Sequence, residues 1–178
     1  TNNTHIKPKC FPDSKKVLVA FSGGKDSLAT VLKLRAKGYE VMLYHILGIN
    51  PSFPTEWKSA KKVAHELGCS IQFAKVSQNG RTDFSENPIK NALILAMMID
   101  YGVQHNVKNY ALGSESEITL TNTPIMAGLS DAKELYDELN NYYGKYIEGF
   151  NFINVLLNTR DSYYTIFDNE QTQLLQYT

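Results

Sequence analysis

The stretch "KKVLVAFSGGKDSLATVLKL", Lys15–Leu34, decides the fold of this chain. It begins with a run of Val, Leu and other apolar residues up to Phe21, which predicts a buried strand. The segment from Ser27 to Gly38 predicts a helix, because four apolar residues share one helical face: Leu28, Val31, Leu32 and Leu34. Between the strand and the helix lies "SGGKDS", which contains more special residues than a tight turn needs. The question is what the chain gains from these residues at the junction.

The same alternation of apolar runs and helical segments continues along the chain. Further strands are expected at Tyr39–Leu47, Cys69–Val76 and Asn109–Glu115, and further helices at Glu56–Gly68, Pro88–Asn106 and Ser130–Tyr146. In the 56–68 helix, four residues are expected on the buried side: Trp57, Ala60, Ala64 and Leu67. Strands joined through helices predict an α/β fold, a three-layer sandwich with a central parallel sheet and helices on both faces.

The remaining segments are less regular. The pattern of Phe150–Leu157 is typical of either a strand or a buried turn of helix. We expect a single domain over residues 1–178, with a flexible lead-in at 1–14 and an irregular tail at 158–178.

The composition excludes several classes of protein. Hydrophobic residues make up 43% of the 178 residues, and 18 basic residues balance 18 acidic ones. This balance argues against a disordered chain and gives no basic excess, so no direct nucleic-acid partner is expected. The two cysteines, Cys10 and Cys69, form no pair at metal-ligand spacing, so zinc is not expected. No apolar run approaches a membrane span of about 20 residues, and we expect a cytoplasmic protein without a membrane partner.

The physics of the Ser22–Ser27 loop favours an anionic ligand. In an open α/β sheet, ligands bind at the carboxyl ends of strands, where N–H groups at helix starts carry partial positive charge. Gly23 and Gly24 are expected to allow positive φ and the close approach of a phosphate. The other residues supply hydroxyl donors, a cation, and a carboxylate for a metal ion or a helix cap: Ser22, Ser27, Lys25 and Asp26. A glycine turn with a serine cap is the plainer interpretation, and neither GxxxxGK[ST] nor GxGxxG occurs in the chain.

The heptapeptide "FSGGKDS" resembles the S-G-G-x-D-S pyrophosphate loop of the ATP pyrophosphatase (PP-loop) superfamily. Members of that superfamily have an adenine nucleotide alpha hydrolase-like fold, cleave ATP between the α and β phosphates, and adenylate an oxygen of their substrate. The resemblance implies ATP and Mg²⁺ as cofactors. It also implies a nucleotide site of eight residues: Ser22, Gly23, Gly24, Lys25, Asp26, Ser27, His45 and Gly113. For His45, packing at the end of its strand is the alternative interpretation.

Catalytic and metal-binding roles are implied for a few charged residues. Lys25 and Lys90 would balance the charge on the pyrophosphate, and Asp26 would hold Mg²⁺ or fix the geometry of the loop. Glu115 would join Asp26 at the metal, with a plain surface carboxylate as the alternative.

Two further motifs resemble 7-cyano-7-deazaguanine synthases. The segment "ENPIKNALILAMMIDYGVQHNVKNYALGSESE" is similar to the part of that family in which P-G-R-N precedes a long apolar helix, with Pro88–Asn91 at the motif. The segment "GLSDAKELYDELNNYY" is similar to a Y-P-D-C-R followed by a helix, which implies Asn91, Asp131 and Lys133 as substrate-binding residues. The implied substrate is the carboxylate of 7-carboxy-7-deazaguanine, with ammonia as the nucleophile. The chain departs from the family because no cysteine follows Cys69, whereas the family holds zinc with four C-terminal cysteines.

Other functions remain open from the sequence. An adenine-nucleotide-binding module or subunit without catalysis would need the same loop. Sulfonucleotide reductases also carry SGGKDS, but their chemistry needs a nucleophilic cysteine towards the C-terminus, and this chain has none there. Tyrosines of the last third of the chain favour a core or an oligomer interface over a base-stacking platform, so a homo-oligomer is one expected partner.

Overall fold

The elements alternate along the chain as the sequence predicts. The computed structural model describes residues 8–12, 15–49, 54–76, 90–113, 133–156 and 172–177. The strands are β1 (Lys16–Ala20), β2 (Glu40–Leu47), β3 (Ile71–Lys75), β4 (Asn109–Ala111) and β5 (Asn151–Ile153). The helices are α1 (Lys25–Ala36), α2 (Glu56–Glu66), α3 (Lys90–Gln104), α4 (Lys133–Tyr143) and the 3₁₀ helix η3 (Thr172–Tyr177). The ambiguous segment 150–157 thus contains a strand.

The five strands form one parallel sheet in the order β3-β2-β1-β4-β5. The chain builds outward from β1 through β2 to β3, and then returns to place β4 on the other side of β1. The strand order therefore reverses between β1 and β4, which is the place where open α/β sheets bind ligands. The predicted α/β class with a central parallel sheet is confirmed.

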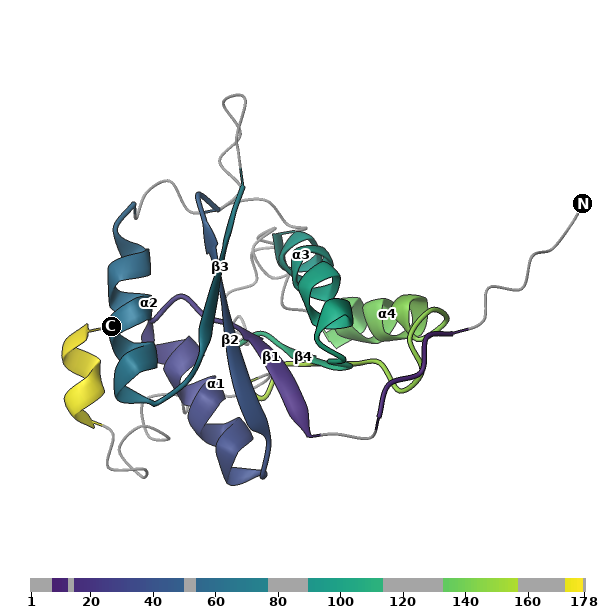
Figure 1. Ribbon diagram of the computed structural model, residues 1–178, viewed down its shortest axis with the longest axis horizontal. Helices are drawn as coiled ribbons and strands as arrows, with labels where there is room; N and C mark the ends of the chain where they lie inside the picture. Colours follow the sequence, from purple (N-terminus) through teal and green to yellow (C-terminus); the bar gives the residue numbers. More distant parts are fainter. Residues whose placement is uncertain are drawn as a thin grey trace, which may run out of the picture.

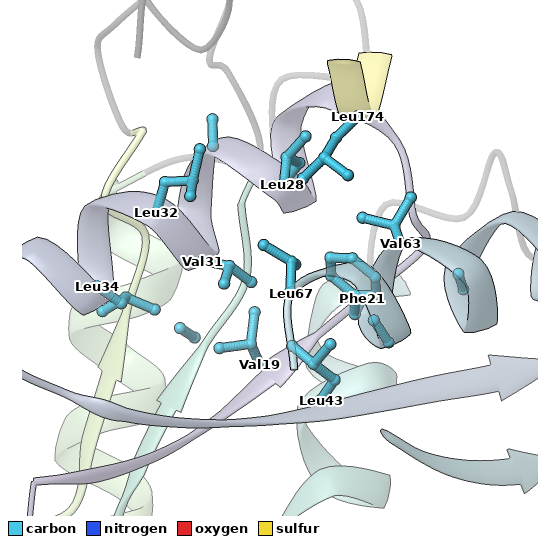
Figure 2. Packing of buried hydrophobic residues seen from close by; sticks show 14 of the residues in the cluster. Val19, Phe21, Leu28, Val31, Leu32, Leu34, Leu43, Val63, Leu67 and Leu174 are labelled. Carbon is cyan, nitrogen blue, oxygen red and sulfur yellow. The ribbon is translucent and has the colours of Figure 1, made fainter. Parts of the chain in front are cut away.

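Helices cover both faces of the sheet, which gives the three predicted layers (Figure 1). Residues alternate between the two faces of β1, so Val17 and Val19 pack under α1 and α2 while Leu18 packs under α3 and α4. Figure 2 shows the first of these clusters, in which Leu28 and Val31 of α1 lie above Val19. All four apolar residues predicted on one face of α1 are buried.

Two end segments have more structure than the sequence indicates. In the tail expected to be irregular, η3 lies beside α2 (Figure 1) and buries Leu174 to 2% exposure within the cluster under α1 and α2. Within the expected lead-in, Lys9 pairs in parallel with Ile147 and its N–H donates to the carbonyl oxygen of Tyr146 at 2.7 Å. Both segments are ordered by contacts with residues far away in sequence, which a local pattern does not reveal.

Candidate functional site

A cleft of about 200 Å³ opens at the carboxyl edge of the sheet. It lies where the strand order reverses, because the ends of both β1 and β4 contribute to its wall. The lining residues come from strand ends and from the starts of α1, α2 and α3: Ala20, Phe21, Ser22, Ser27, Tyr44, His45, Ile46, Ile49, Glu56, Asn91, Ile94, Leu112 and Gly113. The starts of three helices therefore meet at one cleft, and their partial positive charges favour an anion there.

The serines of the loop organise its backbone. The Gly24 N–H donates to Ser22 Oγ at 3.1 Å, and the Gly23 N–H donates to Ser27 Oγ at 3.2 Å. Ser27 Oγ in turn donates to the carbonyl oxygen of Gly24 at 2.9 Å, and the two serine Oγ atoms lie 3.3 Å apart. Both hydroxyls belong to the wall of the cleft, so the groups that shape the loop are also the groups that a ligand would meet.

Only one of the two loop glycines has the backbone conformation expected of both. Gly23 has a φ of +88°, and a Cβ at this position would lie 2.6 Å from the backbone nitrogen of Ala60 in α2. Gly24 precedes α1 with a φ of −80°, which any residue adopts, so the conformational freedom expected of this glycine is not used there. The loop thus packs closely against α2, which explains why a side chain does not fit at Gly23. The sequence alone did not reveal this packing.

Gly113 also lines the cleft and lies just after β4. A Cβ there would collide with Thr30 Oγ1 and would lie 2.9 Å from the carbonyl oxygen of Asp26. Thr30 is fully buried and donates a hydrogen bond to that same carbonyl oxygen at 2.8 Å. The absence of a side chain at Gly113 therefore lets the end of β4 approach the first turn of α1, beside the loop.

The charged residues of the loop point towards solvent. Lys25 Nζ and Asp26 Oδ1 form an ion pair of 2.6 Å, with 48% and 35% of their side chains exposed. Neither lines the cleft. Lys90 is the first residue of α3, directly before the cleft residue Asn91, and its backbone thus lies at the same edge of the sheet.

His45 is buried in β2 at the wall of the cleft. Its Nδ1 lies 2.8 Å from the carbonyl oxygen of Phe21, and a carbonyl can only accept, so Nδ1 carries the hydrogen and Nε2 is left as an acceptor in the neutral ring. Burial lowers the pKa of His45 below its usual 6.5, and the hydrogen bond to Phe21 opposes this only in part. At neutral pH the ring is therefore uncharged. Its hydrogen bond to Phe21 joins the end of β1 to β2 at the wall of the cleft.

Five residues predicted at the site come together in the cleft: Ser22, Ser27, His45, Asn91 and Gly113. Lys133, one of the three residues expected to contact the substrate, does not line the cleft; it forms an ion pair of 2.5 Å with Asp137 one helical turn later, and its side chain is 66% exposed. The pairing follows from the spacing of four residues on α4, which places the two side chains side by side. Asp131 and Glu115 lie outside the described residues.

The cleft also contains residues that sequence reasoning missed. Glu56 is the first residue of α2 and brings a carboxylate to the wall. The helix after β2 must start at the carboxyl edge of a parallel sheet, so the position of Glu56 was available as a signal. Apolar residues of β2 and α3 form another part of the wall, including Tyr44, Ile46 and Ile94. This part suits a planar ring, whereas the serines and helix starts suit phosphates.

Magnesium would need phosphate oxygens here. Among the described residues, no three His, Cys, Asp or Glu side chains gather in a way that could hold a metal ion. Mg²⁺ typically takes only one or two carboxylates and completes its shell with phosphates and water. Of the two carboxylates near the loop, Glu56 lines the cleft and could serve as such a ligand beside a bound nucleotide, whereas Asp26 lies outside the cleft and is paired with Lys25.

Comparison with known proteins gives the fold alone. No protein-family model matches the chain, and no curated protein matches its sequence. The crystal structure of a predicted subunit of tRNA methyltransferase from Methanocaldococcus jannaschii is similar, with a TM-score of 0.50 and 19% identity over 88% of this chain and 74% of that one. The NH₃-dependent NAD synthetase from Campylobacter jejuni subsp. jejuni shares 18% identity over 94% of this chain and 80% of that one, with a TM-score of 0.46. The first likeness supports the α/β fold and says nothing of the reaction.

Within the described residues, no helix combines the length and the apolar character that crossing a membrane requires.

Proposed function

We propose that this protein binds ATP in the cleft, cleaves it to AMP and pyrophosphate, and transfers the adenylyl group to an acceptor. The observation that carries the proposal is the position of the Ser22–Ser27 loop. It joins β1 to α1 at the place where the strand order reverses, and its two serines line the cleft. Its sequence is the one that resembles the pyrophosphate loop of PP-loop enzymes with the adenine nucleotide alpha hydrolase-like fold.

The residues of the cleft divide into two groups with different tasks. The Ser22 and Ser27 hydroxyls and the start of α1 would hold the β and γ phosphates, with Lys25 and Lys90 supplying positive charge. The apolar wall formed by residues such as Tyr44 and Ile46 would hold the adenine ring beside His45. Bound Mg²⁺ would neutralise charge on the departing pyrophosphate.

The acceptor that we propose is a carboxylate, that of 7-carboxy-7-deazaguanine. A carboxylate oxygen attacks the α phosphate and releases pyrophosphate, and ammonia then displaces AMP to give an amide. A second ATP then adenylates the amide oxygen with release of pyrophosphate, and loss of AMP and a proton gives the nitrile. The support is the resemblance of Pro88–Asn91 to the synthase motif, together with the place of Asn91, buried to 3% exposure at the wall of the cleft.

Calorimetric titration with ATP and Mg²⁺ tests the nucleotide site. We expect Ser27→Ala to weaken ATP binding by about tenfold or more, because a hydroxyl that meets a charged phosphate contributes about 1.5–3 kcal/mol. The double variant Asp26→Ala, Ser27→Ala should abolish binding with the fold intact by circular dichroism. Ser70→Ala is the control, since Ser70 precedes β3 and does not line the cleft. Equal affinities of the Ser27 and Ser70 variants would show that ATP binds elsewhere.

A turnover assay separates catalysis from binding alone. We expect pyrophosphate and AMP to be released from ATP, Mg²⁺ and ammonium only when 7-carboxy-7-deazaguanine is present. Tight ATP binding without turnover would favour the second candidate, a nucleotide-binding module or subunit without catalysis. The observation that favours this candidate is that Lys133, expected to contact the substrate, does not line the cleft and forms an ion pair with Asp137.

A further inference from the structure

The 3₁₀ helix η3 is held against α2 by two of its side chains. Leu174 is 2% exposed and belongs to the cluster under α1 and α2, where it lies with Leu28 and Val63 (Figure 2). At the surface of α2, Lys62 Nζ lies 3.8 Å from the centroid of the Tyr177 ring, a distance typical of a cation–π contact. One contact is therefore apolar and buried, and the other is electrostatic and at the surface.

The buried face of α2 itself is small. Its buried residues are Ala60, Val63 and Ala64, and side chains of this size remove little apolar area from water. Trp57 is expected on the same face from the helical pattern, yet it is 37% exposed and lines a groove at the surface with Phe73. It lies in the first turn, before the part of α2 that packs on the core. Because a helix of this length is stabilised mainly by tertiary packing, the contacts from η3 contribute to holding α2 in place.

In turn, α2 supports the candidate site at its first two turns. A Cβ at Gly23 would lie 2.6 Å from the backbone nitrogen of Ala60, so the loop backbone rests directly on the helix. The Gly23 N–H also donates to Ser27 Oγ, one of the two serine hydroxyls at the wall of the cleft. Glu56, the first residue of α2, lines the cleft as well. A shift of α2 would therefore move both the loop and one part of the cleft wall, since close-packed contacts transmit displacement.

We propose that Leu174 and Tyr177 are positioning residues for the nucleotide site. They hold α2 where it supports the Ser22–Ser27 loop, and so they raise the affinity for ATP although neither residue lines the cleft. The inference rests on the proposed function, since it concerns the same nucleotide. Small displacements are sufficient, because a misplacement of about 1 Å far from the reacting groups can cost about 100-fold in rate.

The coupling between η3 and the cleft must act in both directions. If docking of η3 favours ATP binding, bound ATP favours docking of η3 by the same factor, because the two equilibria are linked. Couplings of this kind typically change an affinity by about 5–150-fold. A side chain that contributes only to global stability changes the free energy of unfolding and leaves the affinity of the folded protein unaltered.

Calorimetric titration with ATP and Mg²⁺ tests the positioning role. We expect Leu174→Ala to weaken ATP binding by about fivefold or more, and Leu174→Met, which refills most of the volume, to restore it. Ile147→Ala is the matched control, because Ile147 is 4% exposed in the cluster on the opposite face and does not line the cleft. It should lower the denaturation midpoint about as much as Leu174→Ala does and leave the ATP affinity unchanged.

A surface variant makes the test independent of the core. Tyr177→Leu removes the ring that meets Lys62 but keeps an apolar side chain, and it should weaken ATP binding by about twofold. Gln173→Leu, at an exposed position of the same helix, is its control and should bind ATP like the unaltered protein. If Leu174→Ala does not fold, this pair of variants decides the question.

Hydrogen exchange measures the coupling from both ends. In Leu174→Ala without ATP, the amides of Gly23 and Gly24 should exchange several-fold faster, because the serine hydroxyls that accept their hydrogen bonds are less well placed. In the unaltered protein, saturating ATP and Mg²⁺ should slow the exchange of the η3 amides by a similar factor.

Three results would overturn the proposal. They are an unchanged ATP affinity in Leu174→Ala, an equal loss of affinity in Ile147→Ala, and unchanged exchange at the two loop glycines. Failure of the unaltered protein to bind ATP would refute the proposed function. Faster exchange in the loop of Leu174→Ala would still be observed in that case, so the two failures are distinguishable.

Discussion

The two faces of the sheet are packed with different kinds of side chain. Under α1 and α2, the buried cluster of the described residues consists of Val, Leu and Ala with a single ring, that of Phe21. Under α3 and α4, five buried residues are aromatic: Tyr44, Tyr110, Tyr136, Phe150 and Phe152. Small aliphatic side chains let backbones approach closely, whereas large rings keep the layers apart and bring polar atoms into the core.

The two faces also differ in the contacts that hold the segments next to them. On the aliphatic face, Gly23 touches the backbone of Ala60, and Gly113 touches Thr30 of α1. On the aromatic face, the hydroxyls of buried rings need acceptors, as where Tyr110 donates to the carbonyl oxygen of Val107 at 2.8 Å. The loop of the candidate site is thus fixed by close backbone contacts, whereas on the opposite face the hydroxyl of Tyr110 is held by a hydrogen bond.

We expect the largest effect when a methyl group is added at Gly23, on the aliphatic face. Gly23→Ala should lower the free energy of unfolding by about 3 kcal/mol, because it adds left-handed strain to overpacking against the backbone of α2. Gly24→Ala is the matched control, since φ is −80° there and the nearest atom to an added Cβ is Ser22 Oγ at 3.3 Å. Chemical denaturation measures both. Similar losses in the two variants would refute the close approach of the loop to α2.

On the aromatic face, we expect a substitution to lower the free energy of unfolding by about the contribution of one hydrogen bond. Tyr110→Phe keeps the ring, which is fully buried and stacked on Phe150, but leaves the carbonyl of Val107 without the hydroxyl. We expect a loss of about 1–2 kcal/mol at neutral pH by denaturant titration.

The same variant has a pH dependence of known sign. Burial raises the pKa of Tyr110 far above its usual 10, so above pH 10 the unfolded chain releases a proton that the folded chain keeps. The stability that Tyr110 contributes is therefore present below pH 10 and lost as pH rises further. The deficit of Tyr110→Phe should shrink between pH 10 and 11. A constant deficit would show that the hydroxyl is not held protonated in the core.

The smallest effect concerns His45, which among the described residues is the buried histidine at the edge of the aliphatic face. Because burial lowers the pKa of His45, the unfolded chain takes up a proton below pH 6.5 and the folded chain resists it. Stability should fall as pH drops below 6.5, and His45→Asn, which keeps a donor for the Phe21 carbonyl, should make that fall shallower. His65→Asn, with 87% of the His65 side chain exposed, is the control and should leave the acid limb unchanged.

Much of the candidate site was predictable from local sequence. Strand ends and helix starts alternate at one edge of a parallel sheet, so Ser22, Ser27 and Asn91 were expected there, and all three line the cleft. Glu56 was missed because no motif contains it, and Lys133 gained a helical partner that the motif does not show.

The sequence by itself determined the succession of strands and helices and the loop at the end of β1, because the periods of apolar residues and the glycines act locally. Only the tertiary structure decided that β4 returns beside β1, that Gly23 and Gly113 are pressed against helices, and that Trp57 stays exposed at a groove. These features depend on which segments pack together across long stretches of chain. Such packing decides between tertiary contacts that the local sequence pattern does not distinguish.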